Sequence, residues 1–186
     1  VLLGHRDPEV EEAAERQRRD GAVLNQPTPR MVELGELLVD RIDFADWTVF
    51  AKNGSDVTTW ATRVAREHTG RPFILKVKGA YHGVDAWCDP GFGGRIPEDR
   101  SHVREFAWND LDELGDLLKE HEDEVAAIVL TPYHHAAFGP SEMPAEGFWK
   151  GVQELCREKG VVLILDDVRA GSRLHDGGSH RFFGFT

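Results

Sequence analysis

Cysteine, basic residues and long apolar runs are all in short supply in this chain of 186 residues. Its two cysteines, Cys88 and Cys156, stand far apart with no paired spacing, so the sequence predicts neither a disulfide framework nor a zinc ribbon. No apolar run approaches the roughly 18–20 residues of a membrane-spanning helix. The first residues also lack the cationic start and apolar core of a signal peptide. We therefore expect a soluble, cytoplasmic globular protein.

The charge balance narrows the range of partners. Twenty-two lysines and arginines face 33 aspartates and glutamates, which gives a net charge of −11. Nucleic acids and anionic membrane surfaces are therefore not expected to bind this chain. Hydrophobic residues make up 40% of the sequence, which is enough for a substantial core.

Segments of strand length alternate with segments of helical periodicity over most of the chain. This order predicts an α/β fold with a mainly parallel sheet flanked by helices. The expected strands are 47–51, 73–77, 125–130 and 161–165, and the helices between and before them are 8–19, 31–42, 55–67, 110–120 and 145–159. We divide the chain into an N-terminal helical portion, residues 1–45, and an alternating portion, residues 46–186.

The run Val161–Leu165 is apolar throughout, which predicts a strand buried on both faces. Such a strand delivers the next residue, Asp166, to the carboxyl edge of the sheet, where open α/β folds bind ligands. A carboxylate there is costly unless a cation or a hydrogen-bond donor meets it. Asp166 could face a ligand together with Val168, or it could cap a following turn or pair with Arg169 or Arg173.

Two turns follow predicted strands and could contribute to the same site. In the first, Gly54 and Ser55 open a helix, where free amides and a hydroxyl can hold a phosphate. The alternative is an ordinary turn with Ser55 or Asp56 as the helix cap. In the second, Tyr81 and His82 stand between glycines and could present a ring to a flat ligand; alternatively, Tyr81 packs on the core and His82 is solvated.

Together these three segments predict a pocket for a planar, phosphorylated, cationic heteroaromatic compound, and pyridoxal phosphate has those properties. The sequence here resembles class III pyridoxal-phosphate-dependent aminotransferases, in particular the glutamate-1-semialdehyde 2,1-aminomutase-like branch. The matching segments are Asn53–Thr58, Arg63–Arg71, Gly79–Gly83, Trp108–Leu111 and Leu165–Arg173. The resemblance implies the large domain of a fold-type-I enzyme, incomplete at both ends.

The resemblance also implies roles for individual residues. Asp166 would pair with the protonated ring nitrogen, and Tyr81 and Val168 would cover the two ring faces. The implied cofactor-binding set is Asn53, Gly54, Ser55, Tyr81, His82, Asp166 and Val168. The lysine that forms the Schiff base in this family has no counterpart among the lysines of this chain. We expect it, together with the C-terminal small domain, beyond Thr186.

The sequence departs from the family pattern where substrate specificity is set. Thr131 stands before Pro132 where the family usually has glutamate. The next residues include His134 and His135, which could contact substrate or could simply be solvated; we expect no metal site from them. Asn25 and Gln26 resemble a segment that borders the substrate pocket in the aminomutase branch.

The expected function is therefore amino-group transfer on a small amino or keto substrate, with pyridoxal 5′-phosphate as cofactor. Alternatives on the same scaffold are intramolecular aminomutase chemistry and amino-acid racemisation or epimerisation. A non-catalytic homologue of the fold is the alternative outside enzymes. By analogy with the family, we expect a homodimer with active sites at its interface.

Overall fold

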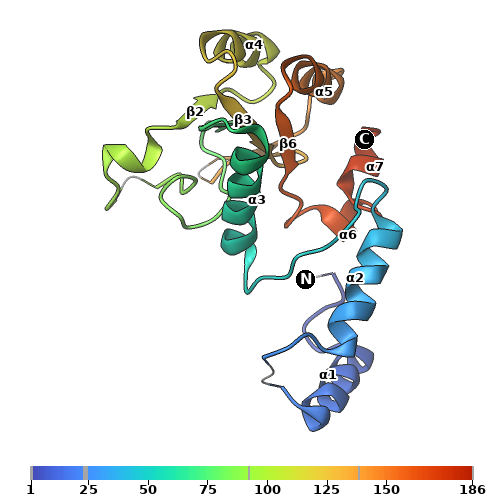
Figure 1. The fold of residues 1–186 in the computed structure, drawn as a ribbon. Helices are drawn as coiled ribbons and strands as arrows, with labels where there is room; N and C mark the ends of the chain where they lie inside the picture. The colour runs from blue at the N-terminus through green and yellow to red at the C-terminus, as the bar shows by residue number, and fades with distance from the viewer. Residues whose placement is uncertain (1, 23–24, 92, 138, 186) are drawn as a thin grey trace. The chain divides into compact units, whose positions relative to one another are not determined.

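The computed structural model describes residues 2–22, 25–91, 93–137 and 139–185. It divides into two compact units, Val1–Thr48 and Val49–Thr186 (Figure 1). The first unit holds helices α1 (Pro8–Asp20) and α2 (Pro29–Arg41), neither of which has a buried residue. The Asp7 carboxylate caps α1 by accepting hydrogen bonds from two amides, and the Thr28 hydroxyl caps α2. None of the described helices is long and apolar enough to cross a bilayer.

The second unit is an α/β fold, which confirms the predicted class. Its helices are α3 (Gly54–Thr69), η1 (Pro97–Arg100), α4 (Leu111–Glu120), α5 (Phe148–Lys159), α6 (Gly171–Leu174) and α7 (Ser179–Phe183). Its strands are β1 (Phe73–Val77), β2 (Val103–Phe106), β3 (Val125–Leu130), β4 (His134–His135), β5 (Ser141–Glu142) and β6 (Val162–Leu165). The main sheet has the order β2-β1-β3-β6 with all pairs parallel, and β4 and β5 form a separate antiparallel pair.

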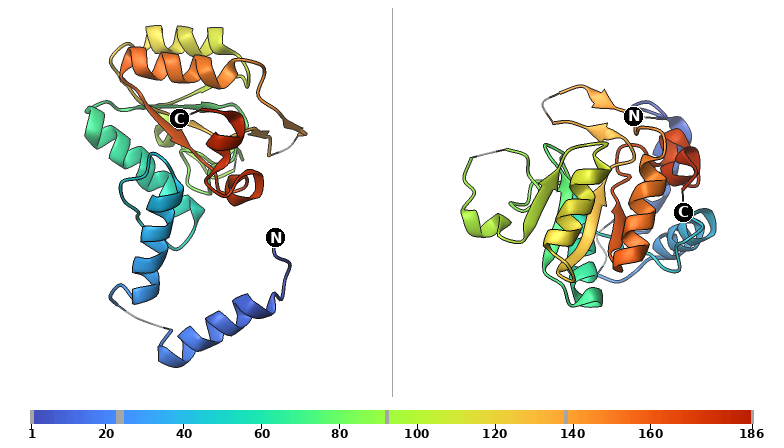
Figure 2. Two further views of the ribbon diagram at one scale, coloured as in Figure 1. Left: turned by 90° about the vertical axis from the view of Figure 1, so that its right-hand side faces the viewer. Right: turned by 90° about the horizontal axis from the view of Figure 1, so that it is seen from above.

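Helices cover both faces of the main sheet. Helices α4 and α5 pack side by side on one face, and α3 contacts β3 and β6 from the other (Figure 2). Alternation along the strands supplies both contacts: Leu75 and Ile128 belong to the core that includes α4 and α5, while Ile74 and Val129 pack with Ala65 of α3. Because all four strands run parallel, their carboxyl ends meet at one edge.

Two strand predictions were wrong. The first was the strand over residues 47–51, because the structure has no regular element there. Trp47 is 66% exposed and Val49 is 47% exposed, so this run has the composition of a strand but no neighbouring strand to bond. The second was the burial of the strand that ends at Leu165. All four residues of β6 are only half-buried, because β6 pairs with β3 alone and forms an edge of the described sheet.

Lys76 on β1 places a cation inside this unit. Its side chain is 0% exposed, and its Nζ lies 2.8 Å from Glu105 Oε1 and donates to the Ala80 carbonyl oxygen at 3.3 Å. Burial lowers the pKa of Lys76, and the neighbouring Glu105 carboxylate opposes that effect. The amine is thus committed to a buried ion pair.

Candidate functional site

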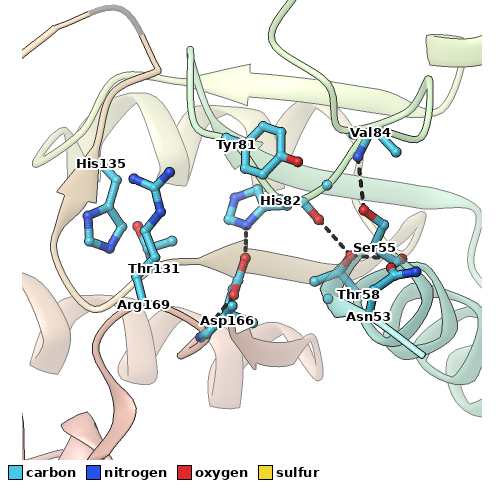
Figure 3. Close-up of a pocket in the computed structure, with 13 residues that line it drawn as sticks. Asn53, Ser55, Thr58, Tyr81, His82, Val84, Thr131, His135, Asp166 and Arg169 are labelled. Atoms are coloured by element: carbon cyan, nitrogen blue, oxygen red, sulfur yellow. Dashed lines mark hydrogen bonds and ion pairs between the residues drawn. The ribbon is translucent and has the colours of Figure 1, made fainter. Parts of the chain in front are cut away.

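A cavity of about 420 Å³ opens at the carboxyl edge of the main sheet (Figure 3). Its size is within the range of about 300–1,000 Å³ for small-molecule sites. The lining residues are Asn53, Gly54, Ser55, Thr58, Tyr81, His82, Gly83, Val84, Thr131, His135, Asp166, Val168 and Arg169. They come from the first turn of α3 and from the segments that follow β1, β3 and β6. No lysine is among the described residues that line it.

The first turn of α3 forms one end of the cavity. Asn53 caps the helix, with its Oδ1 accepting from the Asp56 amide at 3.1 Å, so neither Ser55 nor Asp56 is the cap that the alternative interpretation assumed. No described residue accepts a hydrogen bond from the Gly54 or Ser55 amide. The Ser55 hydroxyl accepts from the Val84 amide at 3.1 Å, which leaves its own proton to donate. Two amides and one hydroxyl are therefore available to an anion at a positive helix end.

Gly83 lets the segment after β1 approach α3 closely. Its φ is +136°, and a Cβ at this position would lie 2.7 Å from Ser55 Oγ and 3.0 Å from Ser55 Cα. The Thr58 hydroxyl fixes the same approach by donating to the His82 carbonyl oxygen at 2.6 Å. Only glycine has both the conformational freedom and the lack of a side chain that this contact requires.

Asp166 lies at the centre of the cavity, directly after β6. Its Oδ2 is 2.8 Å from His82 Nδ1, and its Oδ1 accepts from the Val168 amide at 3.3 Å. The Asp166 side chain is 8% exposed and that of His82 is 0% exposed. The structure therefore shows the turn-capping contact, whereas pairing of Asp166 with Arg169 or Arg173 is not found among the described contacts.

The tautomer of His82 follows from this contact. An ionised carboxylate can only accept hydrogen bonds, so His82 Nδ1 carries the proton. The other ring nitrogen, Nε2, is buried and has no hydrogen-bond partner among the described residues. His82 thus lies behind Asp166, with its ring holding the carboxylate, and is not solvated as the simpler interpretation of this turn would have it.

The side walls of the cavity are apolar and aromatic. Tyr81 is 40% exposed and does not pack into the core, and Val168 is exposed as well. The Val168 methyl groups lie against Gly54, where a Cβ would be 3.6 Å from Val168 Cγ2. A phenol ring and an isopropyl group are therefore both available to contact a flat ligand above Asp166.

The structure separates the two neighbouring histidines. His135 lines the cavity, whereas the ring of His134 stacks on Trp108 with 5.8 Å between ring centroids. Burial lowers the pKa of both imidazoles, and for His135 the nearby Arg169 guanidinium lowers it further. Asn25 and Gln26 belong to the first unit, between α1 and α2, and their contact with substrate stays a prediction.

Several lining residues were not predicted to belong to the site. Thr58 and Gly83 lie inside segments that the sequence singled out, but their roles depend on a contact between α3 and the turn after β1 that no local pattern encodes. Arg169 was considered only as a partner for Asp166. Its position in the same segment as Asp166 and Val168 was the one available signal.

No family model matches this chain. Curated relatives do. An aminopentol aminotransferase of Sphingopyxis macrogoltabida is 42% identical over 173 residues, which cover 93% of this chain and 41% of that protein. A glutamate-1-semialdehyde 2,1-aminomutase of Syntrophobacter fumaroxidans is 33% identical over 198 residues, which cover 100% of this chain and 45% of that protein.

Solved structures that match this chain belong to the same kinds of protein as these relatives. The PLP form of the FumI protein of Sphingopyxis sp. MTA144 matches with a TM-score of 0.94 and 40% identity, over 98% of this chain and 44% of that one. A glutamate-1-semialdehyde aminomutase of Pseudomonas aeruginosa PAO1 matches with a TM-score of 0.86 and 28% identity, over 99% of this chain and 42% of that one. The chain thus spans less than half the length of these relatives.

Proposed function

From the premise that this chain is homologous to class III pyridoxal-phosphate-dependent aminotransferases and aminomutases, we propose that the full-length protein transfers amino groups on a small amino or keto substrate. The observation that carries the proposal is the convergence of three separate segments on one cavity. These are the first turn of α3 with Ser55, the turn after β1 with Tyr81, and the end of β6 with Asp166.

The residues present fit pyridoxal 5′-phosphate at each end of that cofactor. The Gly54 and Ser55 amides and the Ser55 hydroxyl would hold the phosphate, with the Asn53 side chain fixing the turn as its cap. Gly83 lies close to Ser55, where a Cβ would clash with the Ser55 side chain and backbone. The absence of a side chain at Gly83 therefore preserves the shape of the phosphate site. Tyr81 and Val168 would cover the two faces of the ring.

Asp166 would hold a proton on the pyridine nitrogen. Both of its oxygens already accept one hydrogen bond, and each retains a lone pair for a further donor. A buried carboxylate is costly unless a cationic group meets it, so a cationic partner is favoured there. His82 acts as a positioning residue, because its Nδ1 contacts Asp166 Oδ2 and so fixes the orientation of the carboxylate.

When bound, pyridoxal phosphate supplies a cationic ring that accepts electron density from the substrate carbon that loses its proton. This chain supplies the carboxylate that keeps the ring protonated, the walls that exclude water and the cradle that fixes orientation. We propose that the lysine that binds the cofactor and moves the substrate proton lies outside this chain. A cytoplasmic homodimer with shared active sites completes the proposal by analogy.

Intramolecular amino transfer is the second candidate, because aminomutases occur among the relatives alongside aminotransferases. The two differ in whether a separate keto acceptor is needed. The test is to purify the full-length protein with pyridoxal phosphate, record its visible absorption and measure transfer from an amine to a keto acid. We expect a visible band that the amine removes and the keto acid restores. Absence of both the band and the transfer would contradict the proposal.

A further inference from the structure

One end of the cavity is not used by the proposed cofactor contacts. Figure 3 shows Arg169 and His135 on the side of Asp166 that is away from Ser55. Both residues line the cavity, and the positive charge of Arg169 lowers the pKa of His135. Two antiparallel contacts, Ala80 with Ala136 and the Ala137 amide with the Gly79 carbonyl oxygen, attach the His135 segment to the turn after β1.

The two side chains have unused donor capacity. The Arg169 guanidinium makes no hydrogen bond or ion pair with any described residue, although the chain carries 33 acidic residues against 22 basic ones. His135 is 6% exposed, and its Nε2 is buried without a hydrogen-bond partner among the described residues. A buried polar atom without a protein partner, in a residue that lines a cavity, calls for a hydrogen bond from water or from a ligand group.

The chemistry of this pair selects an anion. A guanidinium presents parallel N–H donors that match the two oxygens of a carboxylate, and an imidazole N–H can add a third hydrogen bond. A cationic or purely apolar group would be repelled by Arg169 or would leave His135 unsatisfied. The Asp166 carboxylate, which also lines the cavity, is already held by His82 and by the Val168 amide.

We propose that Arg169 and His135 form a subsite for the carboxylate of the substrate, so that the protein acts on keto acids and amino acids in preference to simple amines and aldehydes. This substrate class rests on the proposed amino-transfer function. The phosphate cradle at Ser55 and this subsite then hold the two anionic groups at opposite sides of Asp166.

The test compares two acceptors that differ only in the carboxylate, 2-oxobutanoate and propanal, with the full-length protein loaded with cofactor. Arg169→Gln is expected to raise KM for 2-oxobutanoate by about 10- to 100-fold, the usual loss for a hydrogen bond to a charged group, and to leave propanal within about twofold. Arg169→Lys keeps the positive charge but not the paired N–H donors. Its KM for 2-oxobutanoate should therefore lie between those of the wild type and Arg169→Gln. Arg157→Gln, on the exposed side of α5, is the matched control.

A binding measurement separates this inference from the proposed function. Calorimetric titration uses butanoate and, as the comparison without a carboxylate, butanamide; neither of them can react. Binding of butanoate should be abolished in Arg169→Gln and retained in Arg157→Gln. This result would support the subsite even in a protein that transfers no amino group. Equal binding of butanoate by wild type and Arg169→Gln would overturn the subsite. So would equal loss of both acceptors with a changed visible spectrum, since Arg169 would then serve the cofactor.

Discussion

Replacing Asp166 with alanine is expected to lower kcat/KM by about 10²- to 10⁴-fold and to weaken retention of pyridoxal phosphate. Loss of one partner from a buried charged pair costs about 3–5 kcal/mol, and each 1.4 kcal/mol corresponds to about a factor of ten. Here the pair is the 8% exposed carboxylate with the proposed cationic ring. The measurements are steady-state kinetics and the amount of cofactor left after dialysis.

Asp166→Asn separates charge from shape. The amide oxygen can still accept from the Val168 amide, and the NH2 group can donate to Nδ1 of the other neutral His82 tautomer, so both local contacts can survive while the negative charge is lost. We expect a loss of rate close to that of Asp166→Ala with little change in thermal stability. Asp116→Ala, whose side chain is 77% exposed on α4, is the control and should retain full activity. Wild-type rates in both Asp166 variants would refute the assigned role.

The second large effect is expected at Gly83. Its φ of +136° disfavours any L side chain, and an added Cβ would lie 2.7 Å from Ser55 Oγ. Strain at such a position costs about 1–3 kcal/mol, and overpacking adds about 1–3 kcal/mol. The Ser55 backbone must therefore shift, and Gly83→Ala should raise the dissociation constant of pyridoxal phosphate by about 10²-fold, a loss of about 2.8 kcal/mol.

Gly115→Ala provides the matched control for this substitution. Gly115 lies inside α4, and an added Cβ there would have no atom within 4 Å. Alanine should stabilise the helix by about 0.5–1 kcal/mol and leave cofactor affinity unchanged. Titration of each variant with pyridoxal phosphate, together with thermal unfolding, measures both quantities. Unchanged cofactor affinity in Gly83→Ala would show that the close contact with Ser55 does not shape the cradle.

Local sequence patterns were sufficient to predict the strands that are fully buried and the helices. Strands β1 and β3 agree with their predicted bounds, because each is a run of residues buried on both faces. The predicted helices were also found, with caps at Asp7 and Asp110 and an end at Gly70. Strand β2 was missed because it is only four residues long and its two central residues are the partly exposed Arg104 and Glu105, so that only pairing with β1 defines it.

The site was predictable in its residue types but not in its contacts. Gly54, Tyr81 and Asp166, which line one cavity, were predicted because each lies in a characteristic local pattern at the end or start of an element. The bond between His82 and Asp166 joins residues 84 positions apart, and the contact of Gly83 with Ser55 likewise depends on the packed sheet. His135 was named as a possible substrate contact, but its proximity to Arg169 in the cavity was not foreseen, for the same reason.

The most direct test of the central claim is the structure of the full-length protein with pyridoxal phosphate bound. We expect the phosphate at the amides of Gly54 and Ser55, and the ring between Tyr81 and Val168. The ring nitrogen should lie about 2.7–2.9 Å from an Asp166 oxygen, the range of a charge-assisted hydrogen bond. A cofactor bound elsewhere, or a ring nitrogen that does not contact Asp166, would contradict the proposed role of this cavity.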